Sequence, residues 1–157
     1  SRPAVEAGES IGFLPGEMED KLAPYLRPLY DALSDRISMK RVRALMAEGA
    51  IEIAPVGFMR GRTLNNAFVV IDEAQNCTYV QLKMLLTRLG WHSTMVVTGD
   101  RTQSDLPGGR AEGLDEALAI LEGVEGVGIA RFSEADVVRH PLVGRIVAAY
   151  NKKDSRQ

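Results

Sequence analysis

The sequence predicts an α/β fold in which a mostly parallel sheet is covered by helices on both faces. Apolar residues recur at helical spacing in some segments and form short continuous runs in others, and the two kinds of segment alternate along the chain. Apolar residues make up 45% of the 157 residues, which is enough for a buried core without disulfides. We place one domain at residues 1–150 and a polar C-terminal tail at 151–157.

The expected elements follow from this alternation. In chain order, helices are expected at 17–33, 38–49, 78–90, 114–121 and 133–150. Strands are expected at 51–54, 67–72, 94–98 and 127–132. Ser38 and Thr78 are predicted N-caps, because their hydroxyls can accept from the first free N–H groups of a helix. Pro24 and Pro28 should kink or divide the first helix, and Pro141 should interrupt the last.

Charge is nearly balanced overall but unevenly distributed. The net charge of −2 argues against a protein that binds nucleic acid or a membrane over its whole surface. Residues 1–20 hold one basic and five acidic residues, however, and residues 36–62 hold six basic and two acidic ones. The basic segment is either a solvated helix face or a local nucleic-acid surface.

The chain shows no sign of a membrane partner or a disulfide framework. Its longest apolar runs, such as Ala67 to Ile71, are about five residues, far short of a membrane span. A single cysteine, Cys77, cannot form an internal disulfide and is typical of a reducing compartment. We therefore expect a cytoplasmic protein.

Two adjacent acids at the end of a buried strand are the strongest functional signal. The apolar run Phe68 to Ile71 leads directly into Asp72 and Glu73. Ligands of open α/β sheets bind at the carboxyl ends of the strands, and unpaired acids are rarely buried for packing alone. This pattern suits nucleoside triphosphate hydrolysis, with Asp72 holding Mg²⁺ and Glu73 activating water. The alternative, an acid that caps the next helix, is weakened because Thr78 fills that position.

A second strand, at 94–98, ends in the same way. Thr98, Asp100 and Gln103 follow it, and Gly99 permits a tight turn. If the two strands are neighbours, the amide of Gln103 could donate to a terminal phosphate and accept from the attacking water. In isolation, Thr98 to Asp100 would equally suit a simple turn.

Five segments together resemble one family. They are GFMRGRT at 57–63, VVIDEAQN at 69–76, LTRLG at 86–90, TGDRTQSDLP at 98–107 and DVVRHPLV at 136–143. In this order they resemble the PhoH family of phosphate-starvation-inducible P-loop ATPases, which are similar to the first motor domain of superfamily-one helicases. The resemblance implies a RecA-like P-loop NTPase core. The common family pattern has Thr after DEAQN, where this chain has Cys77.

The resemblance also implies roles for individual residues. Asp72 and Glu73 resemble Walker B acids, so Asp72 would bind Mg²⁺ and Glu73 would be catalytic, and Gln103 resembles the phosphate-sensing glutamine. The further residues that it places at the nucleotide are Thr98, Asp100, Arg60 and Arg62. It also makes Arg139 a candidate catalytic arginine and places Arg2 and Pro3 along a nucleic-acid strand.

A phosphate loop is missing from this pattern. No GxxxxGK[ST] motif occurs in the chain, and none of its five lysines follows a glycine. In the family this loop, which cradles the phosphates, precedes the segment that begins RPAVEAGE. We expect the first strand and the phosphate loop to lie before Ser1. The alternative is a degenerate, non-hydrolysing relative.

The sequence supports two functions of different classes. The first is Mg²⁺-dependent ATP hydrolysis coupled to RNA binding or remodelling in a full-length protein. A neighbouring protomer would then supply the catalytic arginine (Arg139, Arg60 or Arg62) within a ring-shaped homo-oligomer. The second is a non-hydrolysing module that docks a partner such as an RNA-processing nuclease. His92 and His140 lack nearby ligands at metal-binding spacing, so we expect no transition-metal site.

Overall fold

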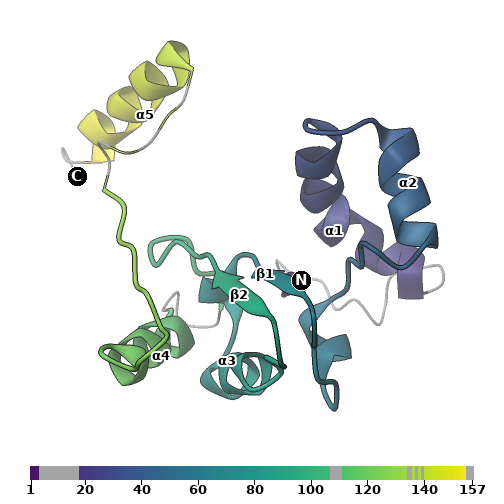
Figure 1. Ribbon diagram of the computed structural model, residues 1–157. Coiled ribbons are helices and arrows are strands. Elements are labelled where there is room, and N and C mark those ends of the chain that lie inside the picture. Colours follow the sequence, from purple (N-terminus) through teal and green to yellow (C-terminus); the bar gives the residue numbers. More distant parts are fainter. Residues whose placement is uncertain (4–17, 107–110, 134–135, 137, 139, 155–157) are drawn as a thin grey trace. The chain divides into compact units, whose positions relative to one another are not determined.

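The computed structural model describes residues 1–3, 18–106, 111–133, 136, 138 and 140–154. The chain forms two compact units, Ser1–Glu122 and Gly123–Gln157. The helices are α1 (Met18–Ser34), α2 (Met39–Ala47), η2 (Val56–Met59), η3 (Ala74–Asn76), α3 (Tyr79–Leu86), α4 (Glu112–Leu121) and α5 (Pro141–Asp154). The strands are β1 (Phe68–Ile71) and β2 (Thr94–Val97), which are parallel (Figure 1). The predicted α/β class with a parallel sheet is confirmed.

β1 lies between β2 and the first residues of the chain. β1 and β2 pair in register from Phe68 with Thr94 to Ile71 with Val97. On the other edge of β1, the main-chain nitrogen of Ser1 donates to the carbonyl oxygen of Val70 at 2.6 Å. The Asp72 N–H donates in turn to the Ser1 carbonyl at 2.9 Å. In a parallel sheet, alternate residues of a strand bond to the neighbour on either side. Val70 and Asp72 bond to Ser1, so the first residues of the chain lie beside β1, and Arg2 lies near the strand ends.

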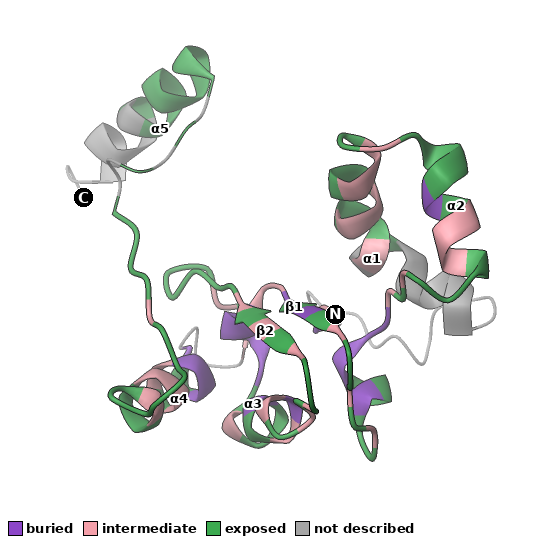
Figure 2. Ribbon diagram, viewed as in Figure 1, coloured by how far each residue is buried: buried purple, intermediate pink, exposed green. Residues whose placement is uncertain are grey.

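The core lies on one face of this sheet. Val69 and Ile71 of β1 are buried together with Leu82 and Leu85 of α3 (Figure 2). Residues of η2, η3 and α4 complete the same cluster: Val56, Met59, Ala74 and Leu114. On the other face, Phe68 is 71% exposed, and Val70 and Val96 are also exposed. Within the described residues, helices therefore cover one face of the sheet, where the alternation along the chain predicts cover on both.

The predicted N-caps are confirmed at α2 and α3, whereas α3 ends at Leu86, before the predicted stop at Gly90. The Ser38 hydroxyl accepts from the N–H of Arg41, and Gly49 follows the end of α2 with a φ of 72°. Thr78 caps α3 in a capping box, in which the Thr78 hydroxyl and the Gln81 side chain each accept from the other residue's main chain. This cap fixes where α3 starts, directly after the polar segment 72–76.

Four further secondary-structure predictions differ from the structure. α1 is one helix through Pro24 and Pro28, which do not divide it. Residues 51–54 form no strand; the chain makes an isolated bridge between Pro55 and Arg2, and proline lacks the N–H that would extend a ladder. Residues 127–132 also form no strand, because nearly all of them are exposed and no described segment pairs with them. α5 begins at Pro141, in agreement with the predicted second piece of the last helix, but it continues past residue 150 to Asp154.

The structure contains no described helix that is both long enough and apolar enough to cross a lipid bilayer.

Candidate functional site

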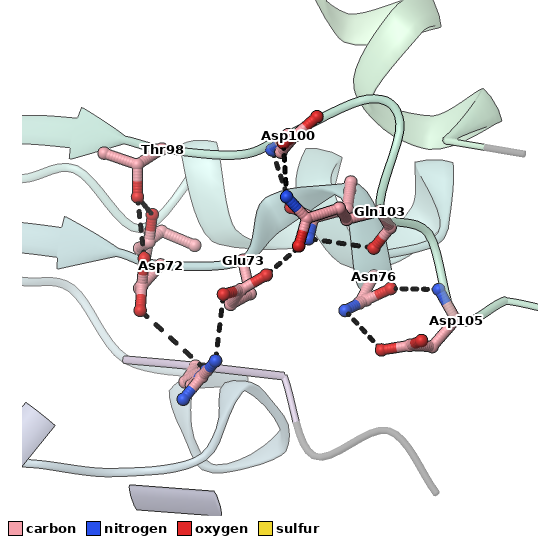
Figure 3. A network of polar contacts seen from close by, with 10 residues as sticks. Asp72, Glu73, Asn76, Thr98, Asp100, Gln103 and Asp105 are labelled. Carbon is pink, nitrogen blue, oxygen red and sulfur yellow. Dashed lines mark hydrogen bonds and ion pairs between the residues drawn. The ribbon is translucent and has the colours of Figure 1, made fainter. Parts of the chain in front are cut away.

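The carboxyl ends of β1 and β2 bring the predicted polar residues together. Because Ile71 pairs with Val97, the residues that follow, Asp72 and Thr98, lie side by side. The Thr98 hydroxyl donates to Oδ1 of Asp72 at 2.9 Å, as Figure 3 shows. Asp72 is therefore placed by strand register, with about a third of its side chain exposed.

Glu73 occupies an unusual backbone conformation at this edge. Its φ of 57° and ψ of 40° are left-handed, a region that costs a non-glycine residue roughly 1–3 kcal/mol and is found most often at functional sites. The next N–H, of Ala74, donates to the Thr98 carbonyl at 2.9 Å and holds the turn in place. The turn aims the Glu73 carboxylate at Arg2, whose Nη2 donates to Oε1 at 2.9 Å. Nε of Arg2 also lies 3.8 Å from Oδ2 of Asp72.

Hydrogen bonds to the Asp100 carboxylate fix the conformation of the loop after β2. Oδ1 of Asp100 accepts from the N–H of Thr102 at 2.9 Å and from the Thr102 hydroxyl at 2.6 Å. Its Oδ2 accepts from Nε2 of Gln103, also at 2.6 Å. Asp100 thus fixes the position of Gln103, the residue predicted to sense phosphate.

Two buried residues that the sequence did not single out connect the two loops. Gln75 and Asn76 lie on η3 and are 0% and 7% exposed. Gln75 contacts Glu73, Asp100 and Gln103. Asn76 accepts from the N–H of Asp105 at 2.7 Å. A signal was present in VVIDEAQN, since a pair of amides inside an otherwise buried turn requires specific partners.

A polar pocket opens between these groups. It has a volume of about 330 Å³. Its walls are formed by Arg2, Pro3, Pro24, Glu73, Asn76, Gln103 and Asp105. Three predicted regions of the sequence, the first residues and the ends of both strands, therefore meet at one concave surface.

The other predicted arginines do not line this pocket. Arg60 is exposed after η2. Arg62 forms a bidentate ion pair with Glu52, at 2.5 and 2.7 Å. The hydrogen bonds from Arg62 lower the pKa of the Glu52 carboxyl and raise the pKa of the guanidinium. Arg139 lies outside the described residues.

The cysteine next to the site is packed. Cys77 is 0% exposed, and burial raises the pKa of its thiol to about 11. A thiol with so little thiolate is a poor nucleophile and a poor metal ligand at neutral pH. Cys77 therefore belongs to the core beneath η3.

The donor set at the strand ends suits a hard cation. Asp72 presents a carboxylate beside the Thr98 hydroxyl, and Mg²⁺ in nucleotide sites takes one or two such oxygens together with phosphates and water. The part of the chain that the structure describes holds no group of three histidine, cysteine or acidic ligands of the kind that encloses a metal. The Asp72 carboxylate beside the Thr98 hydroxyl fits Mg²⁺ held jointly with a phosphorylated ligand.

Comparison with known proteins agrees with the motif pattern. A family model described as PhoH-like protein matches residues 1–151. A PhoH-like protein of Synechocystis sp. is 58% identical over 155 residues, which cover 99% of this chain and 47% of the relative. A PhoH-like protein of Bacillus subtilis is 54% identical over 154 residues, covering 98% and 48%. The protein named PhoH of Escherichia coli K12 is 48% identical over 153 residues, covering 96% and 43%. The chain thus spans about half the length of the curated relatives it matches.

Proposed function

The chain belongs to the PhoH family, and on this premise we propose that it forms the Walker B half of a Mg²⁺-dependent ATPase. The observation that carries the proposal is the meeting of Asp72, Glu73 and Gln103 at adjacent strand ends, beside a polar pocket. A metal-binding acid, a base and a neutral amide are among the groups that phosphoryl transfer to water uses. ATP is the proposed substrate.

Asp72 is the proposed Mg²⁺ ligand. The Thr98 hydroxyl donates to Oδ1 and orients the carboxylate. A third of the Asp72 side chain remains exposed, which leaves room for a further ligand. When bound, Mg²⁺ would neutralise the charge of the phosphates.

Glu73 is the proposed general base. Arg2 and Gln75 occupy one lone pair on each of its oxygens, while a carboxylate offers about four such positions. Glu73 therefore keeps acceptor capacity for a water molecule in the pocket that it lines. Gln103 lines the same pocket and donates a hydrogen bond to Asp100. We propose that it contacts that water or a phosphate oxygen.

Arg2 and Pro3 connect this site to a proposed RNA partner. Arg2 reaches both acids from the segment that the family resemblance places along a nucleic-acid strand, and Pro3 lines the same pocket. RNA that drew Arg2 towards a phosphate would change the surroundings of Glu73, which would couple RNA binding to hydrolysis. A neighbouring protomer is proposed to supply the catalytic arginine, which would be Arg139, Arg60 or Arg62.

Replacing Glu73 tests the proposal. In the whole protein, Glu73→Gln should lower ATP turnover at least about 100-fold, because it removes the base while keeping the shape of the side chain. Binding of a fluorescent ATP analogue in the presence of Mg²⁺ should change little, because Asp72 remains. Glu116→Gln, on the exposed side of α4, is the matched control and should leave turnover unchanged.

The same assay separates the two candidate functions. Turnover by the wild-type protein that survives Glu73→Gln would contradict the assigned base. A wild-type protein that binds a partner but hydrolyses no ATP, with or without RNA, would favour the non-hydrolysing module. That alternative is supported by the ion pairs of Arg2 with both acids, since Arg2 already neutralises charge that Mg²⁺ would otherwise neutralise.

A further inference from the structure

The buried side chain of Gln75 joins the two loops of the candidate site. Its Nε2 donates both to the Glu73 carboxylate and to the carbonyl oxygen of Gln103, the latter at 3.2 Å. Its Oε1 accepts from the N–H of Asp100 at 3.0 Å. Both amide hydrogens and the amide oxygen are therefore used, by three separate residues.

These partners fix the orientation of the amide. A flipped amide would place its oxygen against the Glu73 carboxylate and the Gln103 carbonyl, which are both acceptors, and its nitrogen against the Asp100 N–H. The side chain is 0% exposed, so water cannot replace a lost partner. One arrangement is therefore strongly preferred over the other.

From this geometry we infer that Gln75 is a positioning residue, which holds the Glu73 carboxylate in a fixed relation to the 98–103 loop. The inference rests on the proposed ATPase function and deepens it. Glu73 needs such support because its left-handed backbone is intrinsically unfavourable. Its other partner, Arg2, has a long side chain that is 20% exposed, whereas Gln75 is held by packing on every side.

The contacts also make Gln75 a mechanical link. Gln103 is tied to Asp100, and Gln75 bonds the main chain of both. A phosphate that moves Gln103 would therefore move the Gln75 amide and, with it, the carboxylate of Glu73. Gln75 would thus couple the phosphate-sensing loop to the base.

Two substitutions separate these contacts. Gln75→Met keeps the length of the side chain and removes every hydrogen bond, while Gln75→Glu keeps an acceptor for the Asp100 N–H and loses both donors. In the whole protein, kcat for ATP should fall about 10–100-fold in each variant, because small misplacements of a reacting group cost about that much. KM for ATP should stay within about threefold. Gln81→Met, which removes the amide of the α3 capping box, should leave kcat unchanged.

Amide hydrogen exchange measures the link without nucleotide. The N–H of Asp100 should exchange at least about tenfold faster in Gln75→Met than in wild type, because its acceptor is gone. In Gln75→Glu this N–H should stay protected although kcat falls. Combining Gln75→Met with Glu73→Gln should lower kcat no further than Glu73→Gln alone, because Gln75 acts through Glu73.

The outcomes distinguish this inference from the proposed function. An unchanged kcat in both Gln75 variants, while Glu73→Gln is inactive, would overturn the positioning role alone. A further loss in the double variant would do the same, since Gln75 would then act independently of Glu73. A wild-type protein without ATPase activity would overturn the proposed function, and unaltered exchange at Asp100 in Gln75→Met would overturn the link itself.

Discussion

Two regions of this chain were both predicted to serve the nucleotide, and different contacts hold them in the structure. The loops after β1 and β2 are joined by hydrogen bonds from the Thr98 hydroxyl to Asp72 and from the Asp100 N–H to Gln75. The loop that carries Arg60 and Arg62 has its main ion pair with Glu52, away from the pocket lining. We call the first the strand-end loops, residues 72–76 and 98–105, and the second the arginine loop, residues 57–63.

The difference shows which kind of prediction a sequence supports. Parallel pairing forces the residues after neighbouring strands to the same edge, so the meeting of Asp72 and Thr98 follows from two apolar runs. Nothing comparable constrains the arginine loop, whose position depends on how η2 packs. A role for Arg62 at a nucleotide would therefore need a conformational change or a second protomer.

The largest effect is expected at Cys77, directly below the strand-end loops. Burial raises the pKa of this thiol from 9.0 to about 11, so its thiolate fraction at pH 8 should be about 100-fold below that of an unperturbed cysteine. Iodoacetamide labelling of Cys77, measured by mass spectrometry of its peptide, should accordingly be at least about 100-fold slower in native protein than in urea. Fast labelling of native protein would show that the core below the strand-end loops opens readily. It would contradict the view that the strand-end loops are more rigidly held than the arginine loop.

Gly99 should give the next largest effect. A Cβ at this position would lie 2.9 Å from Cδ2 of Leu114 and 3.0 Å from Oε1 of Gln75. Gly99→Ala should therefore lower the free energy of unfolding by about 1–3 kcal/mol, measured by urea denaturation. Gly57→Ala is the matched control in the arginine loop, where a Cβ meets nothing within 4 Å, and should change stability by less than about 0.5 kcal/mol. Equal losses in the two variants would contradict the difference in packing.

The sequence predicted the acids, the strands that carry them and Thr98 beside Asp72, but not the contacts that Arg2 and Gln75 make with Glu73. The run Phe68 to Ile71 was enough to place Asp72, because strand geometry is regular and local. The ion pair of Arg2 with Glu73 spans 71 positions and depends on residues 1–3 running beside β1, which no local pattern specifies. Gln75 was missed for the same reason, since two of its three side-chain partners, Asp100 and Gln103, become its neighbours only when both loops fold together.

The smallest effect is expected at the ion pair of the arginine loop. Because Arg62 lowers the pKa of Glu52 in the folded state, this pair stabilises the protein fully above the usual value of 4.5, and the stabilisation is lost as pH falls through the lowered folded pKa. The side chains of Arg62 and Glu52 are 38% and 55% exposed, so the loss at pH 7 in Arg62→Met should be below about 1 kcal/mol. Urea denaturation of both proteins at pH 7, and at the lowest pH at which both stay folded, should show this difference shrinking towards zero. A difference that persists in acid would mean that Arg62 stabilises the loop by packing on Met59, which its Nη1 approaches at 3.9 Å, and not by charge.

If Arg62→Met also lowers ATP turnover while Glu52→Gln does not, Arg62 must leave Glu52 to act, and the arginine loop would join the strand-end loops at the nucleotide.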